Sequence, residues 1–250
     1  MRWKEIITEN ANRVFYHGTA NEKAAMAILE HGINPPDLTN TKNHMLRPVI
    51  GRVYVTPLIS YAQVYAIGGS YAGHETYRVP YEGNEEMFKH IWGGSERHES
   101  RHGYVFVIPA EVMTGDQQPD EDEVGQLYAY YLSGGPSKYA EEEDAAKYEK
   151  LKAMGGIFFT FVSVMNSVVS DAARKRIKQG EYAYYARAGK TALNNKRFTP
   201  ELKKALIDAG CHVAHAGAII PTQCWKIDKA KIGWLEKNGS NFFEIAERIR

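Results

Sequence analysis

This sequence has few of the features that mark secreted, membrane-spanning or strongly charged proteins. Its 250 residues contain only two cysteines, Cys211 and Cys224, too few for a disulfide framework. The amino terminus lacks an apolar signal core, and the longest apolar run, 157–169, is shorter than the roughly 18–20 residues of a membrane span. With a formal net charge of +1, nucleic-acid or membrane binding would need a local patch. These absences predict a cytoplasmic protein without a membrane partner.

No internal repeat and no linker rich in proline, glycine or serine divides the chain. Its apolar content of 44% and charged content of 24% are ordinary for a globular protein. We therefore expect a single α+β domain over residues 1–250. Within it, we expect an irregular insertion at about 68–102 and a helical insertion at about 137–210.

Apolar periodicity and capping residues predict the order of the elements. Strands are expected at 14–19, 52–56, 103–109, 211–220 and 224–227. Helices are expected at 22–31, 60–67, 137–153, 157–178 and 200–209, with a last one from Ser240 to the carboxyl end. Residues 116–123 are expected to form an acidic loop, and the acidic run 141–144 a solvated helix face.

The first expected strand ends at His17, Gly18 and Thr19. Because glycine has no Cβ, a ligand can approach the main chain at such a strand end, beside the imidazole. A second strand contains Tyr54, and the helix after it contains Tyr65. Aromatic faces at these positions can hold a planar cation.

The ordered set Tyr16-His17-Gly18-Thr19, Gly51-Arg52-Val53-Tyr54-Val55-Thr56 and Tyr61-Ala62-Gln63-Val64-Tyr65-Ala66 resembles the ADP-ribosyltransferases of the diphtheria-toxin and poly(ADP-ribose) polymerase type. The resemblance covers about the first third of the chain. It implies a split β-sheet core with helices packed around an NAD cleft. It also implies an enzyme that cleaves NAD at the nicotinamide–ribose bond and transfers ADP-ribose to a macromolecule. One departure is Ala62, where poly(ADP-ribose) polymerases have a serine.

The resemblance assigns a role to each matched residue. Nicotinamide would lie between Tyr54 and Tyr65, and its carboxamide would bond the main chain of Gly18, supported by Thr19. His17 would hold the distal ribose, and together with Tyr54 it belongs to the expected catalytic set. NAD is the expected co-substrate, and no metal is expected.

The family's remaining element is a glutamate that bonds the 2′-hydroxyl of the nicotinamide ribose and stabilises the cationic transition state. The expected late strand at 212–215 has no acidic residue, so the candidates are Glu121 and Glu123, with Glu111 third. Glu123 is preferred because the apolar Val124 and Leu127 follow it, whereas Glu121 is expected to stay in water.

A zinc peptidase is an alternative, because His98-Glu99-Ser100-Arg101-His102 matches the H-E-x-x-H pattern. That chemistry needs a buried helix with both histidines on one face and the glutamate as base. Arg101 is charged where such a helix is usually apolar, and a strand is expected from Gly103. We therefore interpret the match as coincidental.

The acceptor is the least constrained part of the prediction. The basic segments 174–178 and 187–197 have aromatic residues nearby and could follow a phosphate backbone, or be a helix end and a solvated loop. DNA or RNA is therefore preferred over protein as the acceptor. A protein mono-ADP-ribosyltransferase and a non-catalytic NAD- or nucleic-acid-binding module are alternatives. The resemblance also implies a bacterial or phage toxin, phage-defence factor or effector, with a possible antitoxin partner.

Overall fold

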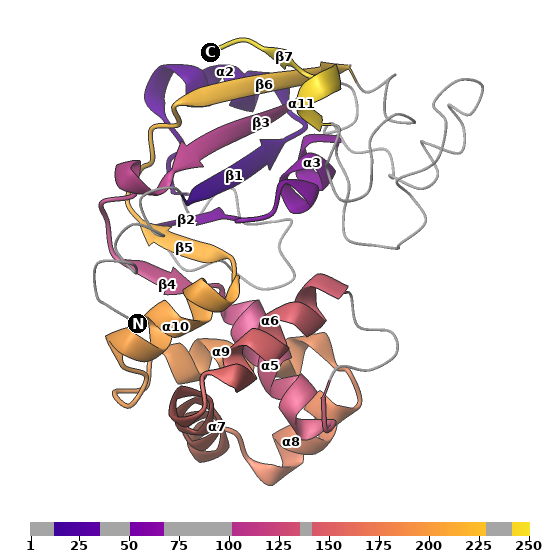
Figure 1. Ribbon diagram of the computed structural model, residues 1–250, viewed down its shortest axis with the longest axis vertical. Helices are drawn as coiled ribbons and strands as arrows, with labels where there is room; N and C mark the ends of the chain where they lie inside the picture. Colours follow the sequence, from indigo (N-terminus) through magenta and orange to yellow (C-terminus); the bar gives the residue numbers. More distant parts are fainter. Residues whose placement is uncertain (1–12, 36–50, 68–101, 136–141, 229–241) are drawn as a thin grey trace, which may run out of the picture. The chain divides into compact units, whose positions relative to one another are not determined.

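The computed structural model describes residues 13–35, 51–67, 102–135, 142–228 and 242–250 (Figure 1). Within these ranges the chain is a mixed α+β protein with two small sheets. It divides into two compact units. The sheet unit comprises 1–35, 55–115 and 217–250, and the helical unit comprises 36–54 and 116–216. Except for His102, the insertion expected at 68–102 lies outside the described residues.

The sheet unit is built on four antiparallel strands in the order β1-β3-β6-β7 (Figure 1). The strands are β1 Val14–Thr19, β3 His102–Pro109, β6 Gln223–Asp228 and β7 Glu247–Arg248. Among its described residues the unit has the helices α2 Glu22–His31, α3 Ile59–Ile67, the short 3₁₀ helix η4 Ala110–Val112, and α11 Phe242–Ile245. As its apolar run predicts, β3 is central and buried on both faces.

Capping residues set the bounds of the first described helix, but the prediction for the last helix is wrong. The Asn21 side chain accepts a 3.0 Å hydrogen bond from the Ala24 amide, and Gly32 at φ 80° ends α2 as predicted. The prediction of a final helix reaching the carboxyl end is wrong. Helix α11 stops at Ile245, and β7 follows because its backbone pairs with β6. Ser240 lies outside the described residues.

The helical unit combines a three-stranded sheet with six α-helices among its described residues. The sheet has the order β2-β5-β4, with β2 Arg52–Val55, β4 Gln117–Pro119 and β5 Val213–Ala216. The helices are α5 Glu121–Leu132, α6 Glu142–Ala153, α7 Gly156–Val168, α8 Asp171–Lys178, α9 Tyr182–Leu193 and α10 Pro200–Ala209. The strands expected at 211–220 and 224–227 therefore exist in part, as β5 and β6, but belong to different sheets.

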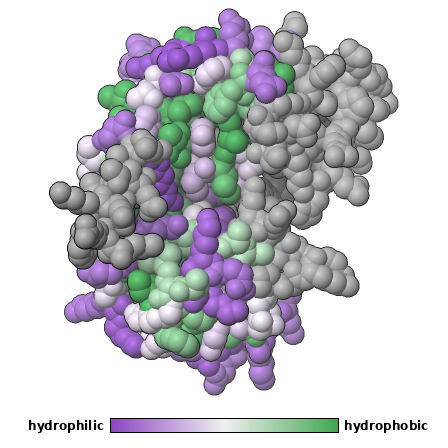
Figure 2. Space-filling model, in the orientation of Figure 1, coloured by the Kyte–Doolittle hydropathy of each residue, from purple (hydrophilic) through white to green (hydrophobic). Residues whose placement is uncertain are grey.

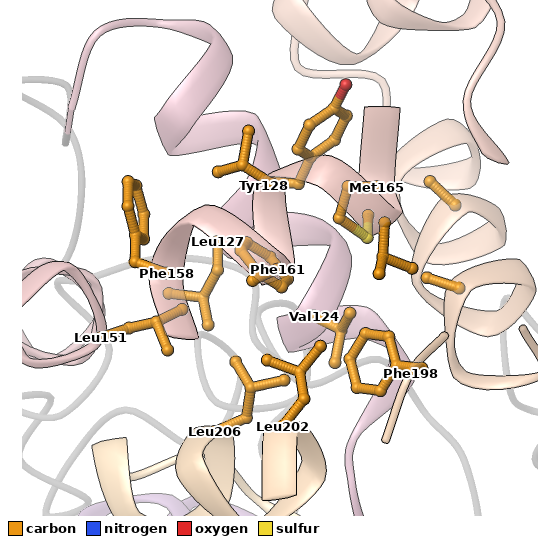
Figure 3. Packing of buried hydrophobic residues seen from close by; sticks show 14 of the residues in the cluster. Val124, Leu127, Tyr128, Leu151, Phe158, Phe161, Met165, Phe198, Leu202 and Leu206 are labelled. Carbon is orange, nitrogen blue, oxygen red and sulfur yellow. The ribbon is translucent and has the colours of Figure 1, made fainter. Parts of the chain in front are cut away.

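One apolar core joins the helices of this unit. Side chains from α5, α6, α7 and α10 point toward one another in Figure 3, among them Leu127, Leu151, Phe161 and Leu206. The buried helix predicted from residue 157 is confirmed, since Phe161 is fully buried. On the face drawn in Figure 2, the surface of the unit mixes hydrophilic and hydrophobic residues.

No described helix is by itself both long and apolar enough to cross a membrane. The segments Asp144–Ala153 and Gly156–Val168 meet that criterion only as a pair, and they are bent by 111° relative to each other.

Three predictions in this unit are wrong. The run from 157 to 178 is two helices, because Val169 leaves the helix and the Ser170 side chain caps α8 by accepting from Ala173 at 3.3 Å. The interpretation of 174–178 as a helix end is confirmed, but that of 187–197 as a loop is wrong up to Leu193, because this part belongs to α9, whose Ala186 and Ala192 are fully buried. The acidic loop at 116–123 is instead strand β4 followed by the first turn of α5.

Helices α5 and α9 cross with their backbones in direct contact. A Cβ added to Gly125 would lie 1.9 Å from the Tyr185 carbonyl oxygen, and one added to Gly189 would lie 1.9 Å from the Glu121 carbonyl oxygen. No side chain fits at either position, which accounts for glycine inside two helices despite its low helix propensity. This crossing holds the first turn of α5, where Glu121 lies.

Candidate functional site

The outer edge of β1 offers main-chain groups for binding. On the side away from β3, the Tyr16 amide donates to the Thr56 carbonyl at 2.7 Å and the Thr56 amide donates to the Tyr16 carbonyl at 3.0 Å. Backbone groups two residues apart in a strand point to the same side, so the N–H and C=O of Gly18 point to this edge too. No turn or loop backbone group in the described ranges bonds them there.

The face of β1 at Gly18 is closed by helix α3. A Cβ on Gly18 would lie 1.9 Å from the Ala62 carbonyl oxygen, so glycine is required for the helix to pack on the strand. The sequence suggested that a ligand approaches Gly18 in the space left by its missing Cβ. That space is filled by α3, so a ligand can reach the Gly18 main chain only from the strand edge. Ala62 is fully buried in this packing, which explains a small apolar residue at the position where the resembled family has serine.

The other predicted residues of the sheet unit lie on β1 and α3. His17 is half-buried and lies opposite Phe106 in the ladder. The Thr19 hydroxyl accepts a 3.2 Å hydrogen bond from the Asn21 amide, so Thr19 links β1 to the start of α2. Tyr65 on α3 is 54% exposed.

In the helical unit, a hydrogen bond between the half-buried Tyr54 and the buried Glu121 joins β2 to α5. The Asp120 side chain caps α5 by accepting from the Asp122 amide at 2.8 Å, which makes Glu121 the first helical residue. The Tyr54 hydroxyl donates a 2.8 Å hydrogen bond to Oε1 of Glu121. Glu121 is only 6% exposed, and its Oε2 has no hydrogen-bond partner among the described residues. One buried carboxylate oxygen is thus left to accept a proton donor.

Glu123, the preferred candidate, has a different environment. Its Oε1 lies 2.5 Å from Nζ of Lys147, and its Oε2 accepts from the His212 amide at 2.5 Å. Burial raises the pKa of this carboxyl, but the contacts with His212 and Lys147 outweigh burial and lower the pKa below its ordinary value. Both oxygens of Glu123 are therefore occupied within the fold.

The expectation that Glu121 stays in water is wrong, because the first turn of α5 packs into the unit. The acidic run at 141–144 is likewise not all solvated. Asp144 is buried and lies 3.1 Å from Lys147, which therefore contacts two carboxylates. Burial lowers the pKa of Lys147, but Glu123 and Asp144 raise it further, so its pKa lies above the ordinary value. Glu111, the third candidate, is exposed in η4.

The buried imidazole of His212 is uncharged at neutral pH. Burial, the largest effect, lowers the pKa of His212 to about 4, although Glu123 opposes the change. Its Nε2 lies 3.4 Å from Oε1 of Glu123. Lys147 is therefore the cation of this cluster.

The sequence contained a signal for the start of α5 that the acidic-loop interpretation missed. Asp120 followed three residues later by Glu123 has the capping-box spacing that marks a helix start. The pairing of Glu121 with Tyr54 joins residues 67 positions apart, and no local pattern reports it.

The zinc-peptidase pattern falls mostly outside the described residues. His98 and Glu99 are not among them, while His102 is the first residue of strand β3. A strand residue cannot complete the helical pair of histidines that this mechanism needs.

Comparison with models of known protein families, with curated proteins and with solved structures gave no match for this chain.

Proposed function

We propose that this protein is an NAD-dependent ADP-ribosyltransferase, with the fold of that class and with Glu121 as its catalytic carboxylate. The observation that supports the proposal most is the buried Glu121, whose Oε1 accepts from Tyr54 and whose Oε2 has no partner in the described part of the chain. Burying a carboxylate is costly unless its hydrogen-bonding capacity is used, so an unfilled oxygen indicates a ligand donor.

The donor in this proposal is the 2′-hydroxyl of the nicotinamide ribose. As the bond between C1′ and the nicotinamide nitrogen breaks, its electron pair leaves with nicotinamide and positive charge develops on the ribose. A fixed carboxylate that bonds the 2′-hydroxyl stabilises that charge. Nicotinamide leaves as a neutral molecule, so no general acid is needed. The acceptor then forms a bond to C1′ and loses a proton.

In the sheet unit, Gly18 and Tyr65 would bind the nicotinamide. The edge-facing amide of Gly18 can donate to the carboxamide oxygen, and its carbonyl can accept from the carboxamide nitrogen. The exposed ring of Tyr65 can stack on the pyridinium plane. His17, at the end of the same strand, would hold the distal ribose.

Nicotinamide release tests the proposal. The purified protein is incubated with NAD labelled on the adenine ring and with a cell lysate, and nicotinamide and labelled polymer are measured. Glu121→Gln should abolish both products, and the exposed Glu111→Gln should leave both unchanged. Absence of both products with the unaltered protein would refute the transferase.

Digestion of the labelled polymer separates the acceptor classes. Label removed by nuclease indicates DNA or RNA, and label removed by protease indicates the alternative protein mono-ADP-ribosyltransferase. A toxin should also slow the growth of bacteria that express it, and Glu121→Gln should restore growth.

A further inference from the structure

The helical unit contains exposed cations that pair with no carboxylate among the described residues. Residues 171–204 contain ten lysines and arginines but only three acidic residues. Several of the cations are paired within the unit: Arg174 with Asp171, Arg176 with Glu181 and Lys204 with Asp208. By contrast, six exposed cations of this stretch have no carboxylate partner in the described ranges, and four of them, Arg187, Lys190, Lys196 and Arg197, belong to α9 and the turn after it.

Arg197, the last of these four cations along the chain, lies beside an exposed face of α7. Arg187 and Lys190 are one turn apart on α9, and the Asn194 side chain donates to the Lys190 carbonyl at 2.9 Å where the helix ends. Lys196 and Arg197 follow in the next turn. Nη2 of Arg197 donates to the Ser163 hydroxyl at 2.9 Å, which places this turn beside α7.

The exposed face of α7 adds an aromatic ring to the cations. Phe159 is one turn before Ser163 and therefore lies on the same side of the helix. It is 71% exposed, the largest exposed fraction among the large hydrophobic residues that the structure describes. Thr160 and Ser163 are exposed on this face, and the Thr160 hydroxyl donates to the Gly156 carbonyl at 2.9 Å. An exposed ring beside unneutralised cations and hydroxyls matches the chemistry of a stacked base and its phosphates.

We propose that the surface formed by Arg187, Lys190, Lys196, Arg197 and Phe159, here called the α7–α9 surface, binds single-stranded nucleic acid. The cations would contact phosphates, and Phe159 would stack on an unpaired base. A single strand is favoured over a duplex because a base must be exposed for its face to reach the ring. The proposal that this surface binds nucleic acid is independent of the proposed function. The further claim that the bound nucleic acid is the acceptor of ADP-ribose rests on the proposed function.

Fluorescence anisotropy tests this surface without NAD. The probe is a fluorescein-labelled 15-nucleotide single strand, oligo(dT) or oligo(U), titrated with the full chain at several salt concentrations. Arg187→Gln combined with Lys190→Gln should weaken binding about tenfold and reduce the slope of log Kd against log salt by about 1.4. Phe159→Ala should weaken binding by about tenfold at every salt concentration, because stacking does not depend on released counterions.

Two control variants test whether binding depends on these particular residues or only on the total charge and apolar content of the chain. Lys23→Gln combined with Arg248→Gln removes the same charge from exposed positions of the sheet unit and should change Kd less than twofold. Ile157→Ala shortens another exposed apolar residue of α7 and should be equally silent.

Equal losses from the two charge variants, or a duplex of the same length that binds as tightly as the single strand, would overturn the proposal. So would the absence of single-strand binding by the unaltered chain. Nicotinamide release measured without nucleic acid reports the transferase separately, so failure of one proposal is distinguishable from failure of the other.

Discussion

The Tyr54 hydroxyl and Oε1 of Glu121 are 2.8 Å apart and join strand β2 to the first turn of α5. The bond fixes the orientation of a carboxylate whose second oxygen has no partner among the described residues. Two positions further along α5, Glu123 has both oxygens occupied by Lys147 and the His212 amide. The two glutamates therefore differ in their partners: one oxygen of Glu121 has no partner in the described ranges, whereas both oxygens of Glu123 are bonded.

Replacing each glutamate by glutamine should show what each carboxylate does. Glu121→Gln should lower the turnover of NAD by about 10²–10³-fold with little change in NAD affinity, because the charge matters mainly in the transition state. Glu123→Gln should keep the chemistry but lower thermal stability, because Lys147 loses a charged partner. Steady-state nicotinamide release and thermal unfolding of the same preparations measure both. If Glu121→Gln were fully active and Glu123→Gln inactive, Glu123 and not Glu121 would be the catalytic carboxylate.

Lys147 should be the most sensitive charged residue of α6. Lys147→Met leaves the buried Glu123 and Asp144 without their cation, and breaking a buried ion pair typically costs about 3–5 kcal/mol. Lys150→Met, three residues further along the same helix, removes an exposed cation and should change the free energy of unfolding by less than about 0.5 kcal/mol. Urea unfolding compares the two. Equal effects would mean that the buried cluster does not stabilise the fold.

The lowered pKa of His212 leads to a prediction of how the stability of the fold depends on pH. Its pKa is about 4 in the folded chain against 6.5 for an ordinary histidine, because burial disfavours the charged ring. Between these values the unfolded chain binds more protons, so the free energy of unfolding rises with pH. Stability should be retained above pH 6.5 and decrease as the pH falls towards 4, by at most about 3 kcal/mol.

The variant His212→Asn should reduce that slope while keeping the main-chain bond from residue 212 to Glu123. The control His31→Asn replaces an exposed histidine and should leave the slope unchanged. Urea unfolding at half-unit steps from pH 4 to 7.5 gives the comparison, and identical slopes for all three proteins would contradict the role of His212.

The crossing of α5 and α9 should tolerate no side chain. Gly125→Ala or Gly189→Ala places a Cβ 1.9 Å from a backbone oxygen, so the helices must separate, at a cost of about 3 kcal/mol or more. In Gly156→Ala the Cβ meets nothing within 4 Å, and stability should stay the same or rise by up to about 1 kcal/mol. Thermal unfolding measures all three. A stable Gly125→Ala variant would show that the crossing is loose.

The sequence predicted correctly the helices whose two ends are set by residues within one turn of them. Asn21 and Gly32 set α2, and Thr199 and Gly210 set α10, because a cap and a left-handed glycine act within one turn. The division between α7 and α8 was missed, although Ser170 is a capping residue, because the apolar and basic segments on its two sides read as one continuous pattern. Helix α9 was missed because its alanine-rich buried side gives a weak apolar pattern.

The sequence predicted those features of the candidate site that depend on a residue's own backbone or side-chain type, but not those that depend on contacts with distant segments. The Gly18 edge follows from the glycine near the end of the strand, but the closure of the adjacent strand face by α3 depends on a helix more than 40 residues later. The choice between Glu121 and Glu123 failed for a similar reason. Apolar neighbours at Val124 and Leu127 predict burial, but not whether an amide and a lysine from distant segments occupy the carboxylate.

Two substitutions at Tyr54 should distinguish its ring from its hydroxyl. Tyr54→Phe keeps an aromatic face for nicotinamide but removes the donor to Oε1 of Glu121, so the carboxylate loses its fixed orientation. We expect kcat to fall by about tenfold or more with KM for NAD nearly unchanged, because a poorly oriented Glu121 weakens a contact that matters mainly in the transition state. Tyr54→Ala also removes the ring and should raise KM as well. Initial rates over a range of NAD concentrations separate the two effects. If Tyr54→Phe raised KM and left kcat intact, the hydroxyl would serve NAD binding and not the orientation of Glu121.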